Sequence, residues 1–181
     1  SGPEAMELSL DWSLHGLYVA RRELFVRYPY DTTCRLYSDD NTTRLHYLHS
    51  DRVACCDGIY YYRQYAGSMT GSVNPLRYDL LEANTSMARM LREENVPVKT
   101  RSRFERERWI NLTGICIYWM TNDEWKRDRN LNDEVLGRLK AVYDDVDRTL
   151  LPALLKMKPG YRPCRSFESY LAQVRRYDKA R

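Results

Sequence analysis

The stretch that decides the fold runs from Trp109 to Met120 and reads W-I-N-L-T-G-I-C-I-Y-W-M. Wound as a helix, this stretch is apolar on nearly every side. A helix of that kind has to be buried all round, because it offers no polar face to water. We therefore expect residues 109–120 to form the central core helix of the protein.

The stretch from Asn132 to Met157 has the opposite character. Its apolar residues recur at spacings of three and four and so form one stripe: Val135, Leu136, Leu139, Val142, Tyr143, Val146, Leu150, Leu151 and Leu154. The other side is charged, and we assign Asp144, Asp145 and Asp147 to it. Pro152 should kink the helix, because proline removes one backbone donor. A buried helix followed by a long amphipathic one predicts an all-α fold, a helical bundle around a central apolar hairpin.

Three further helices are predicted around this hairpin. A cap followed by proline, Asn74-Pro75, begins a helix that ends before Pro97. Its apolar side consists of Leu76, Leu80, Leu81, Met87, Met90 and Leu91. A short helix begins near Ser102 and runs into the core stretch. A last helix begins after Ser166, which has the side chain of a helix cap.

Residues 8–66 allow two interpretations. As helices, they show one apolar face between Leu10 and Phe25, and a second between Leu45 and Tyr60. As strands, the segments L-Y-V-A, R-L-Y-S-D-D-N-T-T-R-L-H-Y-L and I-Y-Y-Y-R-Q-Y are rich in aromatic and β-branched residues. We favour helices, because the C-terminal half requires a helical partner layer. The alternative is an α+β fold with an N-terminal antiparallel sheet.

The length of 181 residues fits a single domain, which we place at residues 7–172. Residues 1–6, which begin S-G-P-E-A, resemble a cloning scar and a leader. Residues 173–181 form a basic tail, and a peripheral contact with a membrane through this tail is one use for it. The five cysteines include no C-x-x-C pair, which favours a reducing compartment. No run of apolar residues is long enough to span a membrane.

The sequence contains no recognisable catalytic motif. It lacks a glycine-rich phosphate loop and the G-x-S-x-G motif, and its carboxylates fall on solvated helix faces. The only histidines are His15, His46 and His49. His46 and His49 share a helical face with Cys56, but no fourth metal ligand accompanies them. We expect a protein that is not an enzyme and that needs no cofactor or metal.

With its helices placed in this order, the chain resembles the Bcl-2 family of apoptosis regulators, and especially its divergent viral members. The family's first motif, L-F-x-D-G-I-N-W-G-R-I-V-A-F-F, is similar to R-E-R-W-I-N-L-T-G-I-C-I-Y-W, and the residues that agree in type are Ile110, Asn111, Ile115, Tyr118 and Trp119. The second motif, L-L-x-W-I-x-x-x-G-G-W-x-x-F, is similar to the segment after Thr149, with agreement at Leu150, Leu151, Leu155, Gly160, Tyr161 and Phe167. A fainter echo of the third motif is R-V-A-C-C-D-G-I.

The resemblance implies a pro-survival regulator that holds the death-motif (BH3) helix of a pro-apoptotic family member in a surface groove. The implied groove residues are Leu81, Met87, Met90, Leu91, Phe104, Arg108, Asn111, Thr113, Gly114 and Ile117. A methionine-rich surface suits an adaptable groove of this kind. The resemblance also implies a cytoplasmic protein, or one at the mitochondrial outer membrane if a C-terminal anchor has been removed, and it allows a homodimer.

One departure from the family affects the expected mechanism. The family's first motif carries Gly-Arg where this chain has Thr113 and Gly114. In the family this arginine pairs with the aspartate of the ligand helix. Here either Arg108 or Arg106 takes its place, with Arg108 as the first candidate, or the groove binds weakly, selectively or not at all. Glycine costs about 1 kcal/mol in a helix relative to alanine, so Gly114 either allows the close approach of another helix or of a ligand backbone, or is a tolerated defect of the helix. The missing arginine also raises a second use of the fold, the inhibition of inflammatory signalling.

A hypothesis of another class is a small nucleic-acid-binding module. If residues 16–66 were strands, Tyr60, Tyr61, Tyr62 and Tyr65 would stack on bases while the basic tail followed the phosphates. The secondary structure of the N-terminal region separates the two hypotheses. We favour the helical regulator, for which nucleic acid is not an expected partner.

Overall fold

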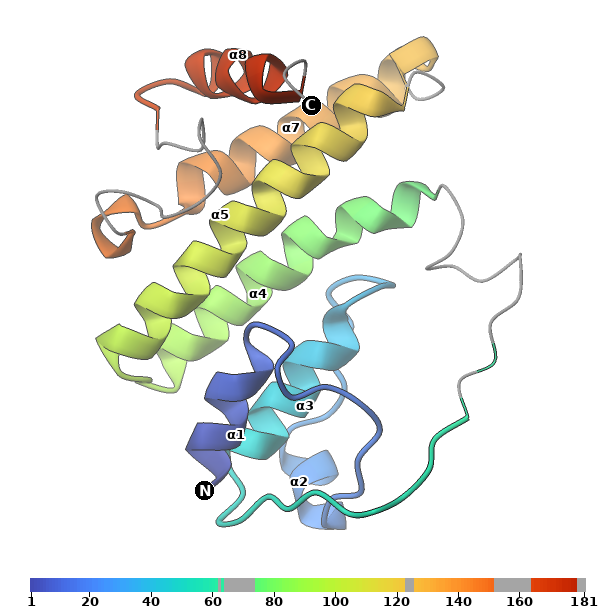
Figure 1. Ribbon diagram of the computed structural model, residues 1–181, viewed down its shortest axis with the longest axis vertical. Helices are drawn as coiled ribbons and strands as arrows, with labels where there is room; N and C mark the ends of the chain where they lie inside the picture. Colours follow the sequence, from blue (N-terminus) through green and yellow to red (C-terminus); the bar gives the residue numbers. More distant parts are fainter. Residues whose placement is uncertain (62, 64–73, 123–125, 152–163, 179–181) are drawn as a thin grey trace. The chain divides into compact units, whose positions relative to one another are not determined.

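The computed structural model of the protein describes residues 1–61, 63, 74–122, 126–151 and 164–178, and all regular structure within them is helical (Figure 1). The predicted all-α fold is therefore confirmed, and the alternative N-terminal sheet has no strand in these residues. The chain forms two compact units, Ser1–Ser86 and Met87–Arg181, where the sequence predicts one domain. None of the described helices combines the length and the apolar character needed to cross a membrane.

The first unit contains α1 (Gly2–Ser9), α2 (Arg22–Arg27), α3 (Ser38–Leu48), the 3-10 turn η1 (Pro75–Tyr78) and the first half of α4 (Asp79–Glu93). Helix α1 packs against α3. Gly2 is required at this contact, because a Cβ atom there would lie 1.9 Å from the carbonyl oxygen of Ser50 and 2.2 Å from that of Tyr47. Met6 is also buried. Residues 1–6, expected to be a scar and a leader, thus begin a helix that belongs to the core of this unit.

The first of the two predicted N-terminal helices is interrupted. Of the apolar face between Leu10 and Phe25, only Leu24 and Phe25 lie in a helix, because α1 ends at Ser9 and α2 begins only at Arg22. Trp12 has a positive φ of 66°, a left-handed conformation that a right-handed helix cannot contain. The apolar spacing in this region therefore does not reflect one helix.

The second predicted N-terminal helix is shorter than its apolar pattern. Helix α3 ends at Leu48, and the hydroxyl of Ser50 donates to the carbonyl oxygen of His46 at 2.6 Å. The described residues from there to Tyr61 have no regular structure. The pattern beyond Leu48 was misleading because its apolar side chains, such as Ile59, are exposed.

The nucleic-acid hypothesis depends on a sheet that carries tyrosines. The described residues between 16 and 61 contain no strand. Tyr60 and Tyr61 are exposed on irregular chain, while Tyr62 and Tyr65 lie outside the described residues. The stacking platform that this hypothesis requires is therefore not formed by the residues that the structure describes.

The second unit contains the rest of α4, α5 (Val98–Thr121), α7 (Arg129–Asp145), the 3-10 turn η2 (Arg148–Leu150) and α8 (Phe167–Asp178). Helix α5 packs against α7, η2 and α8, and α7 runs alongside it in Figure 1. It joins the short helix predicted near Ser102 to the apolar stretch without a break. Phe104, Trp109, Leu112 and Cys116 are all fully buried along it. Helix α5 is thus the core helix of this unit, as predicted, but it is not buried all round, because Ile110, Asn111, Ile117 and Tyr118 are half-buried and Gly114 is exposed.

The amphipathic helix after α5 ends earlier than predicted. Its buried residues Val135, Leu139, Val142 and Tyr143 belong to the expected stripe. Helix α7 nevertheless ends at Asp145, and Asp147 starts the turn η2 by accepting a hydrogen bond from the backbone N–H of Thr149 at 3.0 Å. Polar side chains at the end of the helix thus override the apolar spacing. The predicted kink at Pro152 and the motif residues Leu154, Leu155, Gly160 and Tyr161 lie outside the described residues.

Both predicted caps are confirmed. The side-chain oxygen of Asn74 accepts from the N–H of Leu76 at 2.9 Å, and the hydroxyl of Ser166 accepts from the N–H of Ser169 at 3.2 Å. Helix α8 continues to Asp178, and Val174 on it is buried. Residues 173–178 of the predicted basic tail are therefore part of this helix.

Candidate functional site

Six of the ten predicted groove residues lie on α5, and they occupy two different faces of it. Successive residues of a helix are about 100° apart, so positions 104, 108 and 113 fall within the same half of the helix as the buried Trp109 and Leu112. We call this half the inner face: Phe104, Arg108, Trp109, Leu112, Thr113 and Cys116, all buried. The outer face is Ile110, Asn111, Gly114, Ile117 and Tyr118, which are half-buried or, at Gly114, exposed.

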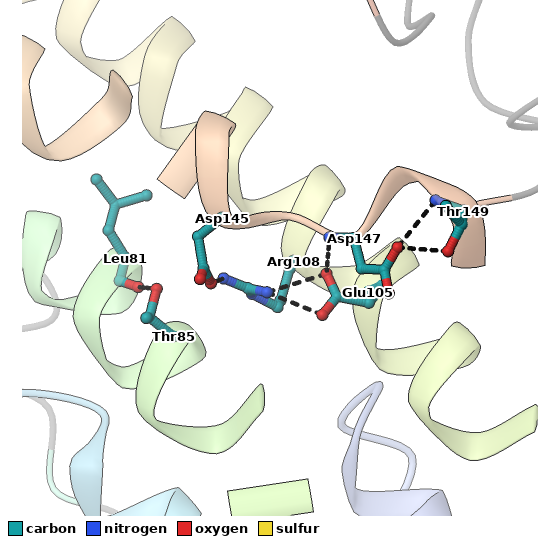
Figure 2. Close-up of polar contacts among 7 residues, drawn as sticks. All are labelled: Leu81, Thr85, Glu105, Arg108, Asp145, Asp147 and Thr149. Carbon is teal, nitrogen blue, oxygen red and sulfur yellow. Dashed lines mark hydrogen bonds and ion pairs between the residues drawn. The ribbon is translucent and has the colours of Figure 1, made fainter. Parts of the chain in front are cut away.

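Arg108 is the centre of a polar network on the inner face (Figure 2). Its Nη1 donates to both carboxylate oxygens of Glu105, at 2.8 and 3.0 Å, and its Nη2 donates to Asp145 Oδ2 at 2.5 Å. Glu105 also accepts from the backbone N–H of Asp147 at 3.3 Å. The side chain of Arg108 has no exposed surface. Arg108 is therefore bound to carboxylates of its own chain. The groove hypothesis, in contrast, requires it to face a ligand.

The network holds one carboxylate in unusual surroundings. Burial raises the pKa of Glu105 above its ordinary value, and the neighbouring Arg108 guanidinium partly offsets this effect. A buried carboxylate of this kind depends on its partner, because a charge left without one inside a protein is costly. The arrangement joins α5 to the end of α7 and to η2, so its first effect is to fix how these elements pack.

Thr113 takes part in the aromatic core of the second unit. Its hydroxyl donates to the carbonyl oxygen of Trp109 at 2.9 Å and accepts from the hydroxyl of Tyr170 at 3.0 Å. The rings of Trp109 and Tyr170 lie 5.1 Å apart, and Tyr143 lies 5.9 Å from Trp109. Thr113 therefore contacts α8, and it stands inside the packed core.

The outer face has a different character. Gly114 is exposed, and no described atom lies within 4 Å of a Cβ placed there. Of the uses expected for Gly114, the close approach of another helix of this chain does not occur among the described residues. Ile117 and Asn111, one turn to either side, are only half-buried. The outer face combines a small residue with partly exposed apolar neighbours in the middle of the longest described helix.

The four predicted residues of α4 are mostly core residues. Met87 and Leu91 are buried in the second unit, and Met90 is half-buried. Leu91 and Phe104 line a small pocket together with Ala88, Arg92, Arg101, Glu105, Asp147 and Leu150. Leu81 is buried in the first unit, and its carbonyl oxygen accepts from the hydroxyl of Thr85 at 3.1 Å (Figure 2). The predicted groove residues therefore do not form one open surface.

Asp145 and Asp147 are exposed, as predicted, but the sequence did not reveal that Asp145 also contacts Arg108 and that Asp147 caps η2. No role was predicted for Glu105. One signal was available, because Glu105 and Arg108 are three residues apart and so adjacent on a helix, immediately before the most apolar stretch of the chain.

Comparison of the chain with protein-family models, with curated proteins and with solved structures gives no match. The family and the function are therefore argued from the residues and from the arrangement of the helices.

Proposed function

We propose that this protein is a non-enzymatic regulator of apoptosis, of the pro-survival kind, that binds a death-motif helix of a pro-apoptotic partner along the outer face of α5. The observation that carries the proposal is Gly114, an exposed glycine in the middle of a packed helix with open space around it. Glycine weakens a helix by about 1 kcal/mol relative to alanine. Without a Cβ atom at this position, the backbone of a ligand helix can approach α5 closely, which accounts for a glycine that destabilises the helix.

The neighbours of Gly114 support the same use. Ile110, Ile117 and Tyr118 are partly exposed on the same side of α5. An amphipathic ligand helix places apolar side chains at spacings of three and four, which match a stripe of this kind. Asn111 supplies a polar group one turn before the glycine, at a position that agrees with the family's first motif.

The buried Arg108 is a poor partner for the aspartate of the ligand helix, so a different arginine is needed. The buried Arg108 already binds two carboxylates. The side chain of Arg106 is 43% exposed, and its Nη1 lies 3.7 Å from Oε1 of the adjacent Glu107, whose side chain is 17% exposed. A pair this long, with its arginine partly in solvent, is weak. We therefore assign the ligand aspartate to Arg106.

Calorimetric titration with a panel of death-motif peptides tests the proposal. At least one peptide is expected to bind more tightly than about 10 μM, which corresponds to roughly −7 kcal/mol. If no peptide in the panel binds this tightly, the proposal that this protein binds death-motif helices is excluded.

The chain offers a matched control for the outer face. Gly137 on α7 is also exposed, and no described atom lies within 4 Å of a Cβ placed there. Gly114→Glu should abolish peptide binding, whereas Gly137→Glu should leave it unchanged, and both variants should keep their helical circular dichroism. A folded Gly114→Glu variant with wild-type affinity would exclude the outer face as the binding site.

A second use of the same fold is favoured by one observation: the family's arginine position holds Gly114, and the nearby Arg108 is engaged inside the chain. A protein without an available arginine at the family's position suits the inhibition of inflammatory signalling better than the capture of a death-motif helix. A cell-death assay separates the two uses. Failure to protect cells after the mitochondrial pathway is triggered, together with binding to a signalling adaptor, would favour the second.

A further inference from the structure

Residues 17–30 are fixed to α3 through one histidine. His46 is buried, and its Nε2 lies 2.7 Å from the carbonyl oxygen of Tyr28, so this nitrogen carries the proton and donates. Its Nδ1 lies 2.7 Å from the hydroxyl of Tyr18. The Phe25 ring packs edge-on against the imidazole, with the ring centroids 4.5 Å apart. The aromatic side chains of this segment are thus held against the first unit.

The aliphatic side chains of the same segment are exposed to solvent. Val19 is fully exposed, and Leu17 and Val26 are 76% and 72% exposed. The rings of Tyr18 and Phe25 are stacked 6.1 Å apart, which brings the backbone next to Leu17 and Val19 near the backbone next to Val26. Three aliphatic side chains at this level of exposure within one short segment favour a partner that covers them.

The charges of the segment define the partner's chemistry. Arg21, Arg22 and Arg27 are all exposed, and Glu23 is the one acidic residue among positions 17–30. Guanidinium groups bind phosphate with two parallel hydrogen bonds. Aliphatic side chains gain nothing from nucleic acid, whose bases stack on aromatic rings, but they gain by entering hydrocarbon. Phosphate beside hydrocarbon is the chemistry of an anionic phospholipid surface.

We propose that residues 17–30 bind an anionic membrane surface, with Leu17, Val19 and Val26 inserted at the boundary of the acyl chains and the three arginines among the headgroup phosphates. The attachment to His46 presents this segment in a fixed conformation, which lowers the entropy lost on binding. This contact is separate from the outer face of α5 and does not depend on the function proposed for that face. It also differs from the contact through the C-terminal tail that the sequence analysis considered.

Flotation with phosphatidylcholine vesicles, with and without phosphatidylserine, tests the proposal. The protein should float only with the anionic vesicles and should be released by salt. Val19→Asp and Val26→Asp should each abolish flotation. The triple variant Arg21→Gln, Arg22→Gln, Arg27→Gln should bind roughly a hundredfold more weakly, at about fivefold for each arginine.

Two control variants carry the same chemical changes elsewhere. Ile59→Asp alters another exposed apolar residue of the first unit, and Arg175→Gln with Arg176→Gln alters two exposed arginines of α8. The test variants and the control variants should all retain the circular dichroism spectrum of the wild type. Only the two control variants should also float like the wild type.

Three results would overturn the proposal. One is equal binding to neutral and anionic vesicles by the wild type. Another is full loss of flotation in the α8 variant with none in the Val19→Asp variant, which would assign membrane contact to the tail. The third is light scattering that shows a dimer of the wild type and a monomer of Val19→Asp, because the occupant of the surface would then be a second copy of the chain.

Discussion

The inner and outer faces of α5 differ in the contacts that a mutation would remove. On the inner face, Arg108 and Thr113 make their hydrogen bonds to other elements of the chain. On the outer face, Gly114 has open space around it among the described residues. Thr113 and Gly114 are adjacent in sequence, yet Thr113 stabilises the fold while Gly114 leaves room for a partner. A set of site residues chosen from one helical motif therefore mixes the two roles.

The largest expected effect follows from the removal of Arg108. Arg108→Met leaves the buried Glu105 without its charged partner, so the variant should lose about 3–5 kcal/mol of unfolding free energy. Urea denaturation measures this loss.

Arg106→Met is the matched control, since it removes an arginine two positions away that makes a surface pair with Glu107. Its cost should stay within about 1 kcal/mol. Equal costs for the two variants would contradict the distinction between the faces. Replacing Glu105, Arg108 and Asp145 together by apolar residues should recover much of the stability that Arg108→Met alone loses.

A smaller effect is expected at Thr113. Thr113→Val keeps the shape of the side chain but removes the acceptor of the buried Tyr170 hydroxyl, at a cost of about 1–3 kcal/mol. Thr121→Val is the control, because Thr121 is exposed and donates only to carbonyl oxygens of its own helix in the bonds recorded for it. If Thr121→Val destabilises as much as Thr113→Val, the hydrogen bond to α8 contributes nothing specific.

The outer face predicts a change of opposite sign. Gly114→Ala should raise the unfolding free energy by about 1 kcal/mol, because alanine favours the helix and the added Cβ meets no described atom. Thermal unfolding should shift upward by about 2–4 °C. Gly137→Ala on α7 should behave alike. A destabilised Gly114→Ala beside a stabilised Gly137→Ala would show that the outer face is covered in the native protein.

The last prediction leaves stability unchanged and compares thiols. Cys116 is fully buried on the inner face, and burial raises its pKa to about 12, while Cys55 and Cys56 are exposed. At about pH 8, roughly one Cys116 in ten thousand is the reactive thiolate. Iodoacetamide should therefore modify Cys55 and Cys56 first, and Cys116 at least about a hundredfold more slowly. Mass spectrometry of the native protein measures these rates, and equal rates would mean that the inner face opens readily.

Signals confined to a few neighbouring residues were read correctly from the sequence. Asn74 before a proline and Ser166 before the last helix both act as caps, because a cap is a contact between a side chain and the next turn. The central position of α5 also followed from its apolar composition. These features do not depend on where distant elements lie.

The features that failed depend on contacts between distant residues. The end of α7 is associated with the contact of Asp145 to Arg108, and these residues are 37 positions apart. The inner and outer faces of α5 could not be separated beforehand, because a stretch that is apolar nearly all round has no periodicity that marks one side. Arg108 and Gly114 were therefore assigned to the same groove.

The hydrogen bond between Tyr170 and Thr113 has a consequence for biosynthesis. It joins residues 57 positions apart, and the ring of Tyr170 also covers Trp109. A ribosome makes the chain from its N-terminus, so α5 leaves the exit tunnel well before α8 is synthesised. During that interval Trp109 and Thr113 lack their final cover. We therefore expect the nascent second unit to bind chaperones that recognise exposed apolar helices, and slower translation between α7 and α8 to prolong this binding.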